Sequence, residues 1–136
     1  MTFDKFTIKA QEVVQEAVNS AQMNGQQTIE PVHLLKGVFV KAKDVASFIF
    51  QKLGVNASQI EMLADQEIKH LPRVQGGQPY LSNDTNKVLT KAMEQAKKMG
   101  DEFVSVEPIL LALLSESSTA SRILKDAGCT ENEMLK

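Results

Sequence analysis

A short stretch of sequence occurs twice in this chain, and it constrains the fold more than any other feature. Residues 28–35 read TIEPVHLL, and residues 105–112 read SVEPILLA. Proline is favoured in the first turn of a helix, where its missing N–H would have had no intrahelical partner. The hydroxyl residue that opens each copy, Thr28 or Ser105, can cap that turn. The aliphatic run after each Glu-Pro pair is apolar nearly all round, which is typical of a helix enclosed by other helices.

The duplication extends to both sides of these two helices. Upstream, an apolar stripe that ends at Gly25 matches a second stripe that ends at Gly100, 75 positions later. The two Glu-Pro pairs are 77 positions apart, so the second copy carries two extra residues just before its cap. Downstream, residues 46–54 match residues 120–128. Three segments in the same order indicate an internal duplication that covers nearly the whole chain.

This pattern predicts an all-α fold of about eight helices, arranged as two four-helix repeats. Repeat one is expected to cover about residues 6–70, and repeat two about residues 81–136. Residues 71–80 contain two prolines and two glycines and are expected to form the loop that joins the repeats. No window alternates cleanly between apolar and polar residues, so no strands are expected.

Local signals predict where individual helices begin. A helix that starts near Thr7 is expected to bury a stripe that includes Ile8, and a later helix capped by Asp44 is expected to bury Phe48. The last helix begins just as the chain ends, so we expect the chain to be part of a longer protein. The N-caps expected for the remaining helices include Asn56, Ser82 and Thr130.

The charge and the cysteine content exclude several classes of protein. A net charge of −2 provides no basic field for nucleic acid. The single cysteine, Cys129, excludes a disulfide framework and a cysteine-based zinc site. The N-terminus has no apolar signal core and no segment is apolar for long enough to span a membrane, so a cytoplasmic protein is expected. His33 and His70 have no carboxylate cluster beside them, and no metal is expected.

The duplicated unit resembles the Clp N-terminal repeat domain family, which forms the first module of ring-shaped AAA+ unfoldases. Both copies contain the family's helix that ends in Gly, its Thr/Ser-x-Glu-His/Pro helix, and its Ala-rich helix that ends in Gly. Residues 29–34 (IEPVHL) and 71–76 (LPRVQG) are most similar to the disaggregase branch of that family. The resemblance implies that the two four-helix repeats are related by a pseudo-twofold axis. It also implies that the domain recognises unfolded or aggregated polypeptide and passes it to the pore of the ring.

The resemblance also implies features that lie outside these residues. The sequence has no Gly-x-x-x-x-Gly-Lys-Ser/Thr phosphate loop, so ATP and Mg would bind in ATPase modules elsewhere in the parent protein. That parent is expected to be a homohexamer and to work with a co-chaperone system of the DnaK type. The fragment itself is expected to hold no cofactor and to have no catalytic site, because no nucleophile–base pair is visible.

A peptide-binding groove is expected at the seam between the repeats, where the first helix of each repeat would face the other. Such a groove needs exposed apolar side chains flanked by polar groups that orient a peptide. Carboxylates beside it would favour segments that carry Lys or Arg. The apolar lining is expected to be Val14, Leu89 and Met93, and the resemblance adds Thr7, Asp101 and Glu107 as polar neighbours.

Other roles remain open for these residues and for the whole domain. Thr7 and Glu107 stand where helix caps and first-turn carboxylates belong, and the apolar residues could be simple core. The alternative function is a docking platform for adaptor proteins, as in the protease-linked Clp ATPases. A self-contained hydrolase is disfavoured by the missing catalytic set, and a helix-turn-helix DNA binder is disfavoured by the acidic balance.

Overall fold

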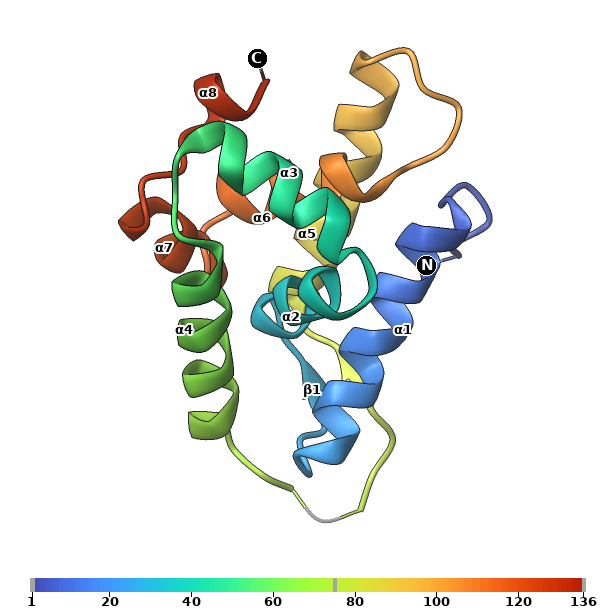
Figure 1. Ribbon diagram of the computed structural model, residues 1–136. Coiled ribbons are helices and arrows are strands. Elements are labelled where there is room, and N and C mark those ends of the chain that lie inside the picture. The colour runs from blue at the N-terminus through green and yellow to red at the C-terminus, as the bar shows by residue number, and fades with distance from the viewer. Residues whose placement is uncertain (1, 75, 136) are drawn as a thin grey trace.

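The computed structural model describes residues 2–74 and 76–135. Met1, Gln75 in the predicted joining loop, and Lys136 at the predicted end of repeat two lie outside the described residues. The predicted all-α architecture of about eight helices is confirmed (Figure 1). The elements are α1 (Ile8–Met23), β1 (Thr28–Ile29), α2 (Pro31–Lys41), α3 (Lys43–Leu53), α4 (Ala57–His70), β2 (Tyr80–Leu81), α5 (Asn83–Lys98), α6 (Val106–Ser115), α7 (Thr119–Asp126) and α8 (Glu131–Leu135).

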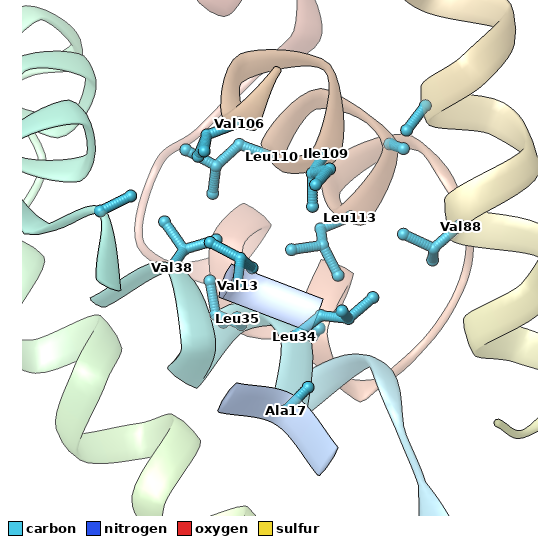
Figure 2. Close-up of a cluster of buried hydrophobic side chains, with 14 of the residues drawn as sticks. Val13, Ala17, Leu34, Leu35, Val38, Val88, Val106, Ile109, Leu110 and Leu113 are labelled. Carbon is cyan, nitrogen blue, oxygen red and sulfur yellow. The ribbon is translucent and has the colours of Figure 1, made fainter. Parts of the chain in front are cut away.

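The two Glu-Pro helices, α2 and α6, form the centre of the molecule. They contact each other, while α1 packs along α2 and α5 packs along α6. Both helices are buried over most of their length, as their nearly continuous apolar sequence predicted. Figure 2 shows their side chains pointing into one cluster, with Leu34, Leu35 and Val38 from α2 and Ile109, Leu110 and Leu113 from α6.

The seam between the repeats is not the predicted one. We expected α1 and α5 to face each other, but the main helix contacts between the repeats are those of α2 with α6 and α7 and of α4 with α7, while α1 packs on α2 and α5 packs on α6. The reason is that α1 and α5 each carry one apolar stripe, which the Glu-Pro helix of the same repeat covers. Gly37 permits the close contact of α1 with α2, because a Cβ atom at this position would lie 2.5 Å from the carbonyl oxygen of Val13.

Short parallel strands, which the sequence did not predict, tie the two repeats together. β1 pairs with β2, so that Ile29 lies opposite Leu81. An isolated bridge joins Phe6 to Val104 in the same parallel sense. These two pairings occupy equivalent places in the duplication, since Phe6 and Leu81, like Ile29 and Val104, are 75 positions apart. A strand of two residues is too short to produce an alternating pattern, which explains why none was expected.

Most of the predicted helix caps are confirmed, because cap geometry depends on local sequence. The Thr7 side chain accepts from the amide N of Ala10 at 3.1 Å, and Ser82 accepts from the amide N of Thr85 at 3.0 Å. Asn56 and Thr130 cap α4 and α8 through the same kind of bond. Asp44 is not a cap, because α3 begins one residue earlier, at Lys43, and Asp44 lies in its first turn.

The caps predicted for the two Glu-Pro helices were wrong in detail. Thr28 lies in β1, and Glu30 occupies the N-cap position of α2. Ser105 does occupy the N-cap position of α6, but its side chain makes no capping bond. The two helices also begin at different places relative to their prolines: α2 begins at Pro31 itself, whereas α6 begins two residues before Pro108. The two extra residues of copy two therefore make the start of α6 longer.

Polar groups attach α4 to the centre of repeat one. Lys36 of α2 forms ion pairs with Glu61 at 2.9 Å and with Asp65 at 3.1 Å, both on α4. Burial alone would lower the pKa of Lys36, but hydrogen bonds and the charges of these two carboxylates raise it above its ordinary value. His33, also on α2, is fully buried, as expected for a packed core histidine, and it reaches α4 through the side chain of Gln26.

Candidate functional site

The structure brings two of the six predicted site residues, Thr7 and Asp101, to one side of the molecule. The amide N of Thr7 donates to the carbonyl oxygen of Val104 at 2.9 Å, so the start of α1 lies against the α5–α6 connection that contains Asp101 (Figure 1). Asp101 is exposed and Thr7 is half-buried. The exposed ring of Phe103 in the same connection lies beneath the Lys5 ammonium group, with 5.8 Å between Nζ and the ring centroid.

The three predicted apolar residues do not line a common groove. Leu89 is 0% exposed and belongs to the core, so it cannot contact a ligand directly. Met93 is half-buried on α5 and packs against the core. Val14 is nearly buried, yet it lines a groove on α1. The prediction for Leu89 was wrong because Leu89 lies on the apolar stripe of α5, and α6 covers that stripe.

The groove that Val14 lines has a volume of about 380 Å³ and follows the outer side of α1; we call it the α1 groove. Its far wall is the half-exposed Phe3, which packs edge-to-face on Phe6 with ring centroids 5.1 Å apart. The Gln11 side chain holds this wall, because its Nε2 donates to the carbonyl oxygens of Phe3 at 3.2 Å and of Phe6 at 3.0 Å. The lining residues are Phe3, Ile8, Gln11, Glu12, Val14, Gln15 and Val18.

Repeat two has a hollow of about 460 Å³ on the outer side of α5, which we call the α5 face. It corresponds to the α1 groove: Asn83, Asn86, Lys87 and Thr90 stand 75 positions after Ile8, Gln11, Glu12 and Gln15. All of its lining residues are polar or charged, whereas the α1 groove also has apolar lining residues. The remaining lining residues of the α5 face are Glu94 and Glu116.

Glu107 lies away from the α1 groove, in a separate pocket of about 120 Å³ among α3, α6 and α8. Exposed apolar side chains surround it there, including Phe48 and Met99. The corresponding glutamate of repeat one, Glu30, lines a pocket of about 220 Å³ beside α4 and α7. The predicted polar neighbours are thus divided between two surfaces, with Thr7 and Asp101 on one and Glu107 on the other.

Two exposed apolar residues were missed by the sequence analysis, which expected both in the core. Ile8 is 78% exposed and Phe48 is 68% exposed. A signal for this was present in the duplication itself, because the second copy carries Asn83 in place of Ile8 and Arg122 in place of Phe48. A position that accepts a polar residue in one copy does not require burial in the other, so comparing the copies would have identified both surfaces.

The chain has one thiol, that of Cys129, and it is buried. Burial raises the pKa of the Cys129 thiol to about 11, so the thiol stays protonated and is a poor nucleophile at neutral pH. Among the described residues, no group of three His, Cys, Asp or Glu side chains is placed to hold a metal ion. No helix in this part of the chain combines the length and the apolar character needed to cross a membrane.

Comparison with known proteins places the sequence in a defined family. The Clp repeat (R) N-terminal domain family matches residues 5–127. The chain is 58% identical over 134 residues to the chaperone protein ClpB of Bacteroides thetaiotaomicron and 47% identical over 131 residues to that of Porphyromonas gingivalis. These alignments cover 98% and 96% of this chain but 16% and 15% of the relatives, so the chain spans a small part of their length.

Solved structures of lower sequence identity share the fold. The Hsp104 N-terminal domain from Candida albicans superposes with a TM-score of 0.81 at 22% identity, covering 96% of this chain and 87% of that one. The N-terminal domain of the ClpV1 ATPase from E. coli superposes with a TM-score of 0.82 at 15% identity, covering 98% and 83%.

Proposed function

The chain belongs to the Clp repeat (R) N-terminal domain family, and from this membership and the geometry above we propose that it is the polypeptide-recognition domain of a ClpB-type protein disaggregase. In this proposal it binds unfolded or aggregated polypeptide and delivers it to an AAA+ ring. The ATPase modules lie outside these residues, in a cytoplasmic parent protein that forms a homohexamer and cooperates with a DnaK-type system.

The observation that supports polypeptide binding most directly is the α1 groove. It combines an exposed Ile8 with the half-buried side chains of Phe3 and Val18 in one concave surface. Exposed apolar surface of this kind is costly unless something covers it, and it is a common mark of a binding site. Gln11 fixes the Phe3 wall in advance, which reduces the entropy lost on binding.

The polar residues beside the groove can orient a bound polypeptide segment. Asp101 and Glu102 are exposed in the connection against which Thr7 is hydrogen-bonded, and Glu12 lies in the groove itself. Carboxylates in these places would attract Lys or Arg side chains of a bound segment and accept hydrogen bonds from its backbone amides. Binding is expected to be weak, because an unfolded segment loses conformational entropy when it is ordered. Weak binding suits a domain that must release its client.

A titration of the ¹⁵N-labelled domain with unfolded casein tests the proposal. Amide shift changes are expected to cluster along the α1 groove and the Asp101–Phe103 connection. Substituting Ile8→Ser should weaken binding by at least about fivefold, since burial of an aliphatic side chain contributes on the order of 2 kcal/mol. Met23→Ser is the matched control, because Met23 is an equally exposed apolar residue at the other end of α1, outside the groove.

The same titration decides between this function and the adaptor-docking platform. The α1 groove is a pre-formed surface on a rigid helix, which a folded partner could also use. If casein produces no localised shifts while a folded adaptor binds at micromolar affinity or tighter, the recognition of unfolded polypeptide is disproved and the docking platform is supported.

A further inference from the structure

We propose that the pocket among α3, α6 and α8, which we call the α8 pocket, binds the segment that follows this sequence in the parent protein. In this proposal the segment continues α8 as an amphipathic helix and packs on α3 and α6. The inference rests on the proposed function in one respect, because it requires a longer parent chain; the ClpB relatives are aligned over only 16% and 15% of their length. It also removes Glu107 from the client-binding surface.

α8 begins in the same way as α4, its counterpart in repeat one. A glycine with a left-handed backbone, Gly54 or Gly128, precedes each helix, and the two glycines are 74 positions apart. Asn56 caps α4 and Thr130 caps α8, each by accepting the amide N–H three residues later, at 3.1 Å and 3.2 Å. The shared start indicates that the two helices occupy equivalent places in the duplication.

In repeat one, the later turns of α4 pack on α2 and on α7. The buried residues of α4 recur every four positions: Ile60, Ala64 and Ile68. Near the end of the helix, Glu67 lines the same pocket as Glu30 and forms an ion pair with Arg122 of α7 at 3.7 Å. Repeat one therefore shows which surface the later turns of such a helix cover.

The equivalent surface of repeat two is the α8 pocket. Glu107 is the counterpart of Glu30, and Phe48 of α3 is the counterpart of Arg122. Both line the pocket, beside Met134 in the first turns of α8. Its volume of about 120 Å³ suits side chains that project from a helix lying over it, and it does not need to hold the helix itself.

The lining of the α8 pocket fits the apolar face of a helix. Three large apolar side chains in it are exposed: Phe48 by 68%, Met99 by 45% and Leu135 by 58%. Apolar surface that is gathered in this way indicates a site that another element covers. Lys52 and Glu107, the charged lining residues, have opposite signs, so the pocket selects its helix by apolar contact.

The duplication also predicts the pattern of the bound segment. Apolar residues are expected four and eight positions after Met134, because the buried residues of α4 have this spacing. A third is expected seven positions after Met134, at the counterpart of Glu67, since Phe48 replaces its partner Arg122. A flexible connection to the ring would then begin only after about two further turns of helix.

Rates of alkylation by iodoacetamide, measured by mass spectrometry, test the inference in three proteins. These are residues 1–136, the same domain with the next about 12 residues of the parent, enough for a helix as long as α4, and the full-length parent. Phe48→Cys reports on the α8 pocket. Met62→Cys is the matched control, because Met62 is an exposed apolar residue of α4 that does not line this pocket. Circular dichroism checks that both variants fold.

Alkylation at position 48 should be at least about tenfold slower in both longer proteins than in residues 1–136, while the rate at position 62 should be the same in all three. Equal rates at position 48 in all three proteins would overturn the inference. Slowing in the full-length parent alone would also overturn it, because the ring would then cover the pocket.

Phe48→Cys removes part of the apolar surface, so the unsubstituted extended domain provides a second measurement. Amide hydrogen exchange of its added residues should be at least about tenfold slower than in the same segment as a free peptide. Exchange as fast as in the free peptide would contradict a bound helix.

The proposed function is tested separately, because the α1 groove and the α8 pocket share no lining residue. A protected α8 pocket in a domain that gives no localised shifts with casein would support this inference and disprove client recognition. Casein binding at the α1 groove with an unprotected pocket would disprove this inference and leave the proposed function intact.

Discussion

Nε2 of the buried His33 lies 2.7 Å from Oε1 of Gln26, inside repeat one. Nδ1 of the same ring accepts the amide N–H of Glu30 at 2.8 Å, so the neutral ring carries its proton on Nε2 and donates it to Gln26. Gln26 in turn donates through Nε2 to the carbonyl oxygen of Ile68 in the last turn of α4. This chain of bonds joins the start of α2 to the end of α4 and satisfies three polar groups in the core.

The stability of the domain should depend on pH through His33. Burial lowers the pKa of His33 to about 4, from an ordinary value of 6.5 in the unfolded chain. Between pH 6.5 and 4 the ring is therefore protonated in the unfolded state but still neutral in the folded state. This contribution to the free energy of unfolding is fully present above pH 6.5 and is lost as the pH falls towards 4. The loss should reach about 3 kcal/mol.

Urea unfolding at pH 7.0, 5.5 and 4.5 measures this loss. The variant His33→Gln serves as the control: it should be less stable at pH 7.0 but should show a smaller decrease over the same range. The carboxylates titrate in both proteins, so only the difference between them reports on His33. Parallel pH profiles for the two proteins would contradict this assignment.

Replacing Gln26 should weaken the attachment of α4. Gln26→Leu keeps a similar volume but leaves Nε2–H of His33 and the carbonyl oxygen of Ile68 without a partner, at a cost of about 2–4 kcal/mol. Gln22→Leu, at an exposed position of α1, should change stability by less than about 0.5 kcal/mol. Hydrogen exchange in α4 should accelerate in the first variant alone; unchanged exchange would argue against a link between Gln26 and α4.

The contact between α1 and α2 should not tolerate a larger residue at Gly37. Gly37→Ala would place a Cβ 2.5 Å from the carbonyl oxygen of Val13, so the helices must separate. We expect a net loss of about 1–3 kcal/mol in the free energy of unfolding, even though alanine is the better helix former by about 1 kcal/mol. Thermal unfolding measures the change. A more stable variant would show that the contact between the two helices can accommodate the added methyl group.

Thr7 has a capping role that can be separated from any contact with a client. Thr7→Ala removes the acceptor of the Ala10 amide and should cost about 1 kcal/mol, while Thr7→Ser should retain most of the stability. If Thr7 also contacts client, the alanine variant should bind unfolded casein more weakly than the serine variant at a temperature where both are folded. Equal affinities would restrict Thr7 to its structural role.

Truncation to alanine should destabilise the domain more at Leu89 than at Met93. Leu89→Ala opens a cavity in the core and should cost about 2–5 kcal/mol, whereas the half-buried Met93 should lose less when changed to alanine. Calorimetric melting temperatures give the comparison. A small effect at Leu89 would mean that the side chain is not enclosed and would reopen its predicted place in the groove.

The boundaries of the helices followed from the sequence because their signals are local. Thr7, Asn56 and Ser82 cap helices where predicted, since a cap needs only the next three residues. Thr28 was assigned wrongly because its backbone is held in β1 by Tyr80, 52 positions away, and its hydroxyl donates to the Tyr80 oxygen at 3.0 Å. No local pattern contains that partner.

The sequence by itself determined the duplication, the all-helical fold and the burial of the two Glu-Pro helices, because repetition and apolar periodicity are properties of neighbouring residues. The tertiary structure decided which side chains remain uncovered: Ile8 is exposed and Leu89 is enclosed, although both belong to apolar stripes. The reason is that an apolar stripe identifies which residues share one face of a helix. The exposure of each residue depends instead on how far the neighbouring helix extends along that face. That extent is set by the packing of α2 and α6 at the centre, which brings together residues far apart in the chain.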